Sequence, residues 1–215
     1  MRIKFERHLN TLTSELITMG SLCEEAILGA EKALALGNIE SIQYVQELSE
    51  EIRQTERTIE RRCLALVLHE QPVAKDLHLV SAALKMITDM KRIGDQAQEI
   101  TEIVAFLNGR HLPDIDTTSM MAEATRSMLS NAIQAFVARD VDKALGVVAD
   151  DDIVDSYFNQ MKSNIIHMIA NGSTDGELAL DLLIIAKYFE RIGDHATNIA
   201  EWIVFSVTGQ HEDEI

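Results

Sequence analysis

Residues 188–201 read Tyr188-Phe189-Glu190-Arg191-Ile192-Gly193-Asp194-His195-Ala196-Thr197-Asn198-Ile199-Ala200-Glu201. An earlier stretch repeats this pattern as Lys91-Arg92-Ile93-Gly94-Asp95-Gln96-Ala97-Gln98-Glu99-Ile100-Thr101-Glu102, and Asp194 follows Asp95 by 99 residues. Both copies set carboxylates into an apolar pattern of helical period. Two such stretches at a constant offset indicate a duplicated structural unit.

The apolar positions around each copy have the spacing of packed helices. Steps of four and three residues alternate, which is the heptad rhythm of helices that lie side by side. The later seam comprises Leu182, Ala186, Phe189, Gly193, Ala196, Ala200 and Ile203, and the earlier seam comprises Ala83, Ile87, Met90, Gly94, Ala97, Thr101 and Val104. Gly is unfavourable by about 1 kcal/mol relative to Ala inside a helix, so Gly94 and Gly193 predict the close approach of a neighbouring backbone.

Helical periodicity continues over almost the whole chain and predicts an all-α fold. The expected helices cover Phe5–Leu36, Ile39–Glu70, Val73 or Asp76 to Asn108, Thr117–Arg139, Val141–Ala170 and 175–207. Helices of this length joined by short loops pack antiparallel to their sequence neighbours. We therefore expect two tandem, similar three-helix bundles built from six long antiparallel helices, with domains at 1–109 and 117–208.

Local signals mark the expected helix ends. Gly37-Asn38 suits a helix end followed by a new N-cap, and Asp140 suits the cap of the fifth helix. Thr174 and Glu177 have the T-x-x-E spacing of a capping box. Gln71-Pro72 predicts a turn, because proline lacks a backbone donor and disfavours helix before it. The acidic end at 211–215 is expected to be loose.

Composition restricts the classes of function. The formal net charge of −16 would repel a phosphate backbone, which argues against nucleic-acid binding and favours cations or basic protein surfaces. No uncharged run approaches the roughly 20 residues that cross a bilayer, and the first residues lack the apolar core of a signal peptide. Cys23 and Cys63 are isolated, as in a reducing compartment. We expect a cytoplasmic protein.

The carboxylates of the later copy predict a metal site. Glu190, Asp194 and Glu201 fall within about 40° of one another around a helix, on the shoulder of its apolar stripe. The preceding helix offers Asp151 and Asp155, again four residues apart. Converging carboxylates repel one another in a helix interface unless they are protonated or neutralised by a cation. Oxygen ligands alone suit magnesium, manganese, calcium or iron.

A plainer interpretation remains open at this point. Acids four residues apart on a helix usually form a solvated face and pair with basic neighbours, here Lys187 and Arg191. His195 alone is more simply a seam or surface histidine than a ligand.

The whole chain nevertheless resembles the PhoU family. The resemblance is carried by residues 190–201, their degenerate copy at 91–102, Gln71-Pro72 followed by Asp76-Leu77, and Met19-Gly20. It implies two similar three-helix bundles and cation binding at paired E/D-x-x-x-D motifs, including multinuclear iron or zinc clusters in some members. It further implies a non-enzymatic negative regulator of phosphate signalling that works between the ATPase subunit of the phosphate ABC transporter and a sensor histidine kinase. Such a protein reaches the membrane only through its partners, and exposed apolar stripes favour a homodimer.

The first half departs from the paired motif. Ser49 and Arg53 stand where Asp151 and Asp155 stand 102 residues later, and Lys91 stands where Glu190 stands. Arg53 and Lys91 are therefore expected to neutralise Asp95 and Glu99 as built-in counter-ions. We predict a metal site in the second half, and a charge-paired or weak site in the first at Asp95, Glu99 and Glu102.

Two other functions fit parts of the pattern. A carboxylate-bridged metal-dependent enzyme also places acids inside a helical bundle, but such sites use Glu-x-x-His, and none of the seven histidines has a glutamate three residues before it. A phosphate receptor would need bridging metals to hold an anion on an acidic face. No Gly-rich phosphate loop or nucleophile elbow is present in the sequence.

Overall fold

A computed structural model describes residues 2–70, 73–107, 109–110 and 112–210, and six helices account for nearly all of this part. The helices are α1 (Arg2–Leu36), α2 (Ile39–Glu70), α3 (Ala74–Phe106), α4 (Ile115–Ala138), α5 (Val141–Ala170) and α6 (Gly176–Thr208). The prediction of an all-α fold made of six long helices is confirmed. The predicted turn at Gln71-Pro72 and the predicted loose end at 211–215 lie outside the described residues.

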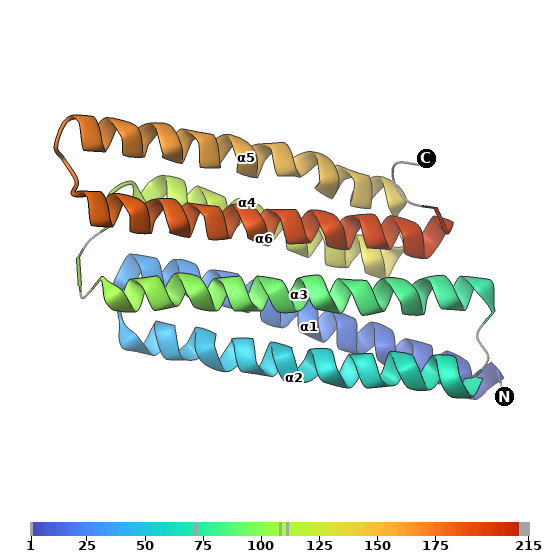
Figure 1. Cartoon of the computed structure of the whole chain (residues 1–215). Coiled ribbons are helices and arrows are strands. Elements are labelled where there is room, and N and C mark those ends of the chain that lie inside the picture. The colour runs from blue at the N-terminus through green and yellow to red at the C-terminus, as the bar shows by residue number, and fades with distance from the viewer. Residues whose placement is uncertain (1, 71–72, 108, 111, 211–215) are drawn as a thin grey trace.

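The helices form two three-helix units that lie side by side (Figure 1). Within the described part of the chain, the units touch through two helix pairs, α3 with α6 and α1 with α4. Figure 1 shows α3 and α6 running antiparallel at the centre, with α2 and α5 at opposite outer edges. The buried side chains join into one core that draws on all six helices.

Capping residues explain several helix boundaries. The side chains of Asn38 and Asp140 accept hydrogen bonds of 3.0 Å from the backbone N–H of Ser41 and Lys143, as predicted. The residue before each cap closes the preceding helix in the left-handed region, with φ of 61° at Gly37 and 53° at Arg139. Arg139 follows Gly37 by 102 residues, so the duplication preserved the turn even where the glycine was lost.

The predicted capping box at Thr174 is wrong. Asp175 is the N-cap of α6 instead, and its carboxylate accepts a 2.9 Å hydrogen bond from the Leu178 N–H. An ionised side chain at this place also interacts favourably with the helix dipole.

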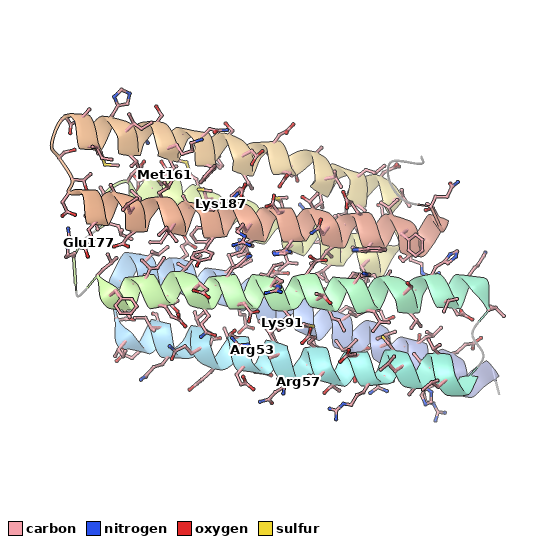
Figure 2. All side chains as sticks on the ribbon, in the orientation of Figure 1. Arg53, Arg57, Lys91, Met161, Glu177 and Lys187 are labelled. Atoms are coloured by element: carbon pink, nitrogen blue, oxygen red, sulfur yellow. The ribbon has the colours of Figure 1, made fainter. Side chains whose placement is uncertain are left out.

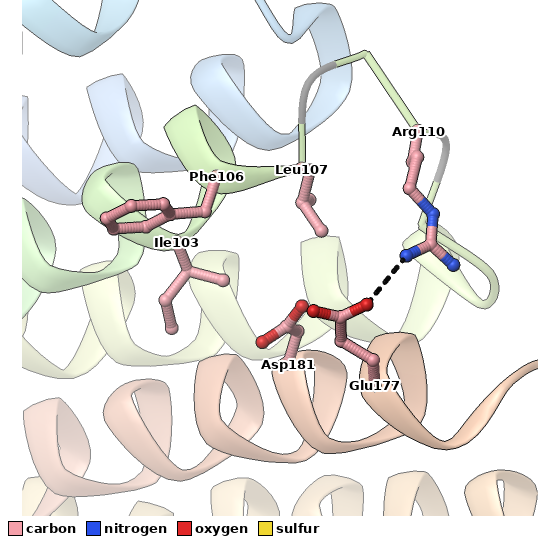
Figure 3. Close-up of a pocket in the computed structure, with 6 residues that line it drawn as sticks. All are labelled: Ile103, Phe106, Leu107, Arg110, Glu177 and Asp181. Atoms are coloured by element: carbon pink, nitrogen blue, oxygen red, sulfur yellow. Dashed lines mark ion pairs between the residues drawn. The ribbon is translucent and has the colours of Figure 1, made fainter.

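The segment between the two units is tied to the start of α6 (Figure 3). Arg110 forms ion pairs with Asp175 and, at 3.5 Å, with Glu177. These contacts border a pocket of about 490 Å³ whose other walls include Phe106 at the end of α3 and Asp181 on α6. The ion pairs therefore hold the connecting segment at the end of the α3–α6 pair.

Polar contacts in the α3–α6 interface follow the internal repeat. Asp89 contacts His195 Nδ1 at 2.8 Å and accepts a 3.2 Å hydrogen bond from Asn198. The Tyr188 hydroxyl donates a 3.4 Å hydrogen bond to Glu99. The 99-residue offset carries Asp89 to Tyr188 and Glu99 to Asn198, so both contacts use the same pair of positions. The two units are thus related by an approximate two-fold axis across this interface.

All seam positions predicted from the heptad rhythm are buried, but the explanation predicted for the seam glycines is wrong. A Cβ atom at Gly94 would lie 2.8 Å from Ile52 Cδ1, and one at Gly193 would lie 3.3 Å from Val154 Cγ1. Both glycines therefore accommodate side chains of the outer helices α2 and α5, and not a neighbouring backbone.

Gly20 of α1 packs closely against Ile133 of α4. A Cβ atom there would lie 2.7 Å from both Cγ1 and Cδ1 of Ile133. Overpacking costs about 1–3 kcal/mol, which exceeds the gain of about 1 kcal/mol in helix propensity. We expect Gly20→Ala to lower the free energy of unfolding by about 1 kcal/mol, measured by urea denaturation.

The double variant Gly20→Ala/Ile133→Ala tests whether the contact with Ile133 causes this loss of stability. Removing the clashing atoms should make the combined loss smaller than the sum of the single losses by at least about 0.5 kcal/mol. Additive losses would show that the Gly20–Ile133 contact is not responsible.

Candidate metal centre

The second-half carboxylates are brought together by α5 and α6. Gly193 lets α5 come close, because a Cβ atom at this position would already lie 3.4 Å from Asp151 Oδ1. Asp151 therefore lies over the centre of the repeated motif. Asp155 follows one turn later on α5, and Glu190 and Asp194 are one turn apart on α6. We call Asp151, Asp155, Glu190 and Asp194 the four-carboxylate cluster.

Burial and mutual repulsion raise the pKa of two members of the cluster, Asp151 and Asp194. Desolvation raises the pKa of the Asp151 carboxyl above its ordinary value, and the negative charges of Asp194 and Asp155 raise it further. Desolvation likewise raises the pKa of Asp194, with an added contribution from Glu190 that Lys187 partly offsets. The protein therefore holds these carboxylates where negative charge is unfavourable, and a bound cation would relieve this strain.

Glu190 is largely enclosed, with 13% of its side chain exposed. Lys187, one turn earlier on α6, forms an ion pair with it, so the plainer interpretation of a charge-paired acid holds at this position. The contact lacks hydrogen-bond geometry, and the buried Oε2 atom of Glu190 makes no hydrogen bond. This oxygen is the one that contacts the Lys187 ammonium, so a metal bound there would take the place of that lysine.

Glu201 is set apart from the cluster along α6, and its role as a ligand stays a prediction. It lies seven residues after Asp194, about 10 Å further along the helix axis. Asp194 and Glu201 share a face of the helix, but they are separated along its axis.

The donor chemistry fits a hard cation, but the ligands are not gathered around one point. No group of three or more Asp, Glu, His or Cys side chains within the described residues is arranged closely enough to hold an ion. The cluster therefore supplies the charge and the enclosed oxygen for a metal, while the final coordination would require side-chain rotation.

In the first half, basic side chains of the chain itself neutralise the carboxylate. Arg53 on α2 donates a 3.1 Å hydrogen bond from Nε to Asp95, and Lys91 donates a 2.8 Å hydrogen bond to the other oxygen of that carboxylate. Arg53 also donates to Gln98 at 2.7 Å. Figure 2 labels Arg53 and Lys91 on these two adjacent helices. The predicted charge pairing is confirmed for Asp95.

The predicted pairing of Glu99 is not what the structure shows. Glu99 accepts its hydrogen bond from Tyr188, in the interface with α6. Glu102 accepts a 2.8 Å hydrogen bond from Gln98. The three first-half acids therefore have different partners and do not form a copy of the four-carboxylate cluster.

Two groups near the site were missed from the sequence. Thr197 lies beside Asp151 and lowers the pKa of that carboxyl, although its buried hydroxyl makes no hydrogen bond of regular geometry. Asp89 binds His195 from the opposite unit and explains why this histidine lies in the seam. The 99-residue offset could have indicated Asp89 from the sequence, because this residue is equivalent to Tyr188, the first residue of the later copy of the motif.

A tandem of three-helix units, related by an approximate two-fold axis and bearing a carboxylate cluster on one of them, defines a class of duplicated helical-bundle proteins. The sequence profile of the PhoU domain matches residues 16–104 and again residues 118–203. The chain belongs to the PhoU family.

Proteins that match almost the full length of the chain carry the same family name. A protein of Clostridium acetobutylicum named "Phosphate-specific transport system accessory protein PhoU homolog" is 31% identical, across 97% of this chain and 96% of its own length. A protein of Synechocystis sp. with the same name is 32% identical, across 98% and 94%. The crystal structure of PhoU from Pseudomonas aeruginosa superposes with a TM-score of 0.90 at 30% identity, covering 96% of this chain and 100% of that one.

These relatives are named as accessory proteins. Helices able to span a membrane are not found among the described residues.

Asp151→Asn is expected to raise the free energy of unfolding of the metal-free protein at neutral pH. A carboxyl with a raised folded pKa contributes stability below its unfolded pKa and loses it as the pH rises through the folded value. The gain from Asp151→Asn should therefore be largest at neutral pH and vanish below the ordinary aspartate pKa of 3.8, in urea titrations across pH.

Asp95→Asn is the control, because it removes the same charge from a carboxylate that has cationic partners. This change should lower the free energy of unfolding by about 1 kcal/mol, since it leaves Arg53 and Lys91 without their shared carboxylate. Stabilisation by both changes would contradict the different roles assigned to the two halves.

Proposed function

We propose that this protein is a negative regulator of phosphate signalling and uptake. It acts as a cytoplasmic, metal-binding adaptor between the ATPase subunit of the phosphate ABC transporter and a sensor histidine kinase. The single observation that carries the metal-binding part is the contrast between the two halves. Asp95 forms ion pairs with two cations, whereas the equivalent Asp194 lies among the carboxylates of Glu190 and Asp155, whose effect Lys187 and His195 offset only in part.

A divalent or multinuclear metal would be held by Asp151, Asp155, Glu190 and Asp194. Iron, zinc, manganese and magnesium all suit a set that contains carboxylates. The metal would supply the positive charge that Arg53 and Lys91 supply in the first half. Glu190 would exchange its contact with Lys187 for the metal, so loading should free this lysine.

Metal loading tests the site directly. Protein stripped with a chelator and reloaded with iron, zinc or manganese should retain metal after desalting, as measured by elemental analysis. Asp155→Ala and Glu190→Ala should each reduce the retained metal by roughly tenfold or more, because each removes a charged ligand.

Glu99→Ala is the control for metal loading, since its carboxylate lies outside the four-carboxylate cluster and bonds to Tyr188. Its metal content should match that of the unchanged protein. Retention of metal by both Asp155→Ala and Glu190→Ala would remove the site assignment. Equal occupancy of the two halves would refute the division of roles between them.

The adaptor role is supported by the names of the relatives, which describe accessory proteins of the phosphate-specific transport system. The high negative charge favours basic protein surfaces as partners. Exposed apolar side chains such as Phe106, which is 82% exposed, favour further association, and a homodimer is part of the proposal.

Capture of the transporter ATPase tests the adaptor role. The immobilised chain should retain the purified ATPase subunit of the phosphate transporter from the same genome, and should not retain an unrelated ABC ATPase. Surface plasmon resonance gives the affinities. Equal retention of both ATPases, or of neither, would contradict the proposed partner.

A further inference from the structure

The second half also has a groove, on the side of α5 opposite to the four-carboxylate cluster. This groove of about 730 Å³ runs between α4 and α5, with one side bordered by α1. Met120, Ile153 and Tyr157 form its apolar surface. Met120 and Ile153 remain 49% and 47% exposed, which is high for large apolar side chains.

The duplication provides an internal comparison for this groove. The 102-residue offset that relates Gly37 to Arg139 and Asn38 to Asp140 equates Met120, Ile153 and Tyr157 with Thr18, Glu51 and Thr55. All three first-half residues are polar. The scaffold is therefore stable with polar groups at these positions, and folding alone does not account for the apolar ones.

The edges of the groove are acidic. Glu31, Asp116 and Glu123 line it, and its lining residues, all of them described, include no lysine or arginine. Glu123 is paired with Arg126, whose charge also interacts with Glu31, so one arginine beside the groove faces three acids and the edge stays negative. A second copy of this chain would bring another −16 formal charge toward these acids, which disfavours it as the occupant.

The walls determine what type of segment fits. The backbone groups of α4 and α5 are bonded within their own helices, so no sheet edge is available for a strand to join. A groove between two helices instead accepts a third helix whose apolar residues recur every three to four positions.

We propose that the α4–α5 groove binds a basic amphipathic helix of a protein partner. Apolar anchors of that helix contact Met120, Ile153 and Tyr157, while its lysines and arginines lie near Glu31 and Asp116. This inference rests on the proposed adaptor function and names a partner surface for it. The groove is separate from the four-carboxylate cluster, because Ile153 faces α4 whereas Asp151 faces α6.

A synthetic peptide tests the groove without knowledge of the natural partner. The probe is a fluorescein-labelled leucine–lysine helix of about five turns, compared with a peptide of the same composition in scrambled order. Fluorescence anisotropy with the full chain should give roughly tenfold tighter binding of the amphipathic peptide. Equal affinities for the two peptides, or no binding of either, would overturn the proposal.

Ile153→Glu places the first-half residue in the groove and should weaken binding of the amphipathic peptide roughly tenfold. Tyr157→Thr should also weaken it. The matched control is Ile166→Glu, which adds the same charge on the same helix at a position that is 64% exposed and does not line the groove. Because these side chains are partly exposed, circular dichroism should show unchanged helicity.

Two outcomes identify a different explanation. If Ile166→Glu weakens binding as much as Ile153→Glu, the attraction is general electrostatics and the groove is not the site. If sedimentation shows that Ile153→Glu dissolves a dimer, the occupant is a second copy and the proposed partner is wrong.

Capture of the transporter ATPase separates this inference from the function on which it rests. Failure of the unchanged chain to retain the ATPase contradicts the adaptor role, whereas the peptide result still decides whether the groove binds basic helices. If the ATPase is retained equally by the unchanged chain and by Ile153→Glu, and the peptide affinities are also unchanged, the groove is refuted and the adaptor role stands.

Discussion

The antiparallel contact between α3 and α6 is the constraint on which the rest of the structure depends. Alternating steps of four and three residues keep one narrow stripe of each helix in the seam, and Gly94 and Gly193 leave space for the outer helices behind it. The hydrogen bonds of Asp89 and Glu99 across this contact then hold the two helices in register. Once α3 and α6 are fixed, short connections place α2 and α5 at the outer edges, where the polar sites lie.

Duplication allowed one scaffold to meet the same electrostatic requirement in two ways. A carboxylate near the seam is unfavourable unless positive charge is close. The first half surrounds Asp95 with Arg53 and Lys91, so its charge is balanced by the chain itself. The second half has Asp155 and Glu190 at those positions, and desolvation and their negative charges raise the pKa of the Asp151 carboxyl. A difference of a few side chains thus separates a structural ion pair from a candidate binding site.

The outer helix α5 shows how one element serves two surfaces. Its carboxylates at 151 and 155 lie toward α6, while Ile153 and Tyr157 line the groove with α4. Successive residues point about 100° apart around a helix, so positions two apart lie on nearly opposite sides. A cation and a partner helix would therefore occupy different faces of the same rigid helix. Each surface can be altered separately by substitution.

The sequence by itself determined the six helices, the caps at Asn38 and Asp140, the buried seam, and the pairing of Arg53 and Lys91 with Asp95. These features follow from local periodicity, or from comparing two copies of one motif. Only the tertiary structure decided that Glu99 binds Tyr188 and that the seam glycines face side chains. Periodicity gives the angle of a residue around its own helix, whereas its partners depend on how far helices distant in sequence slide and rotate against one another.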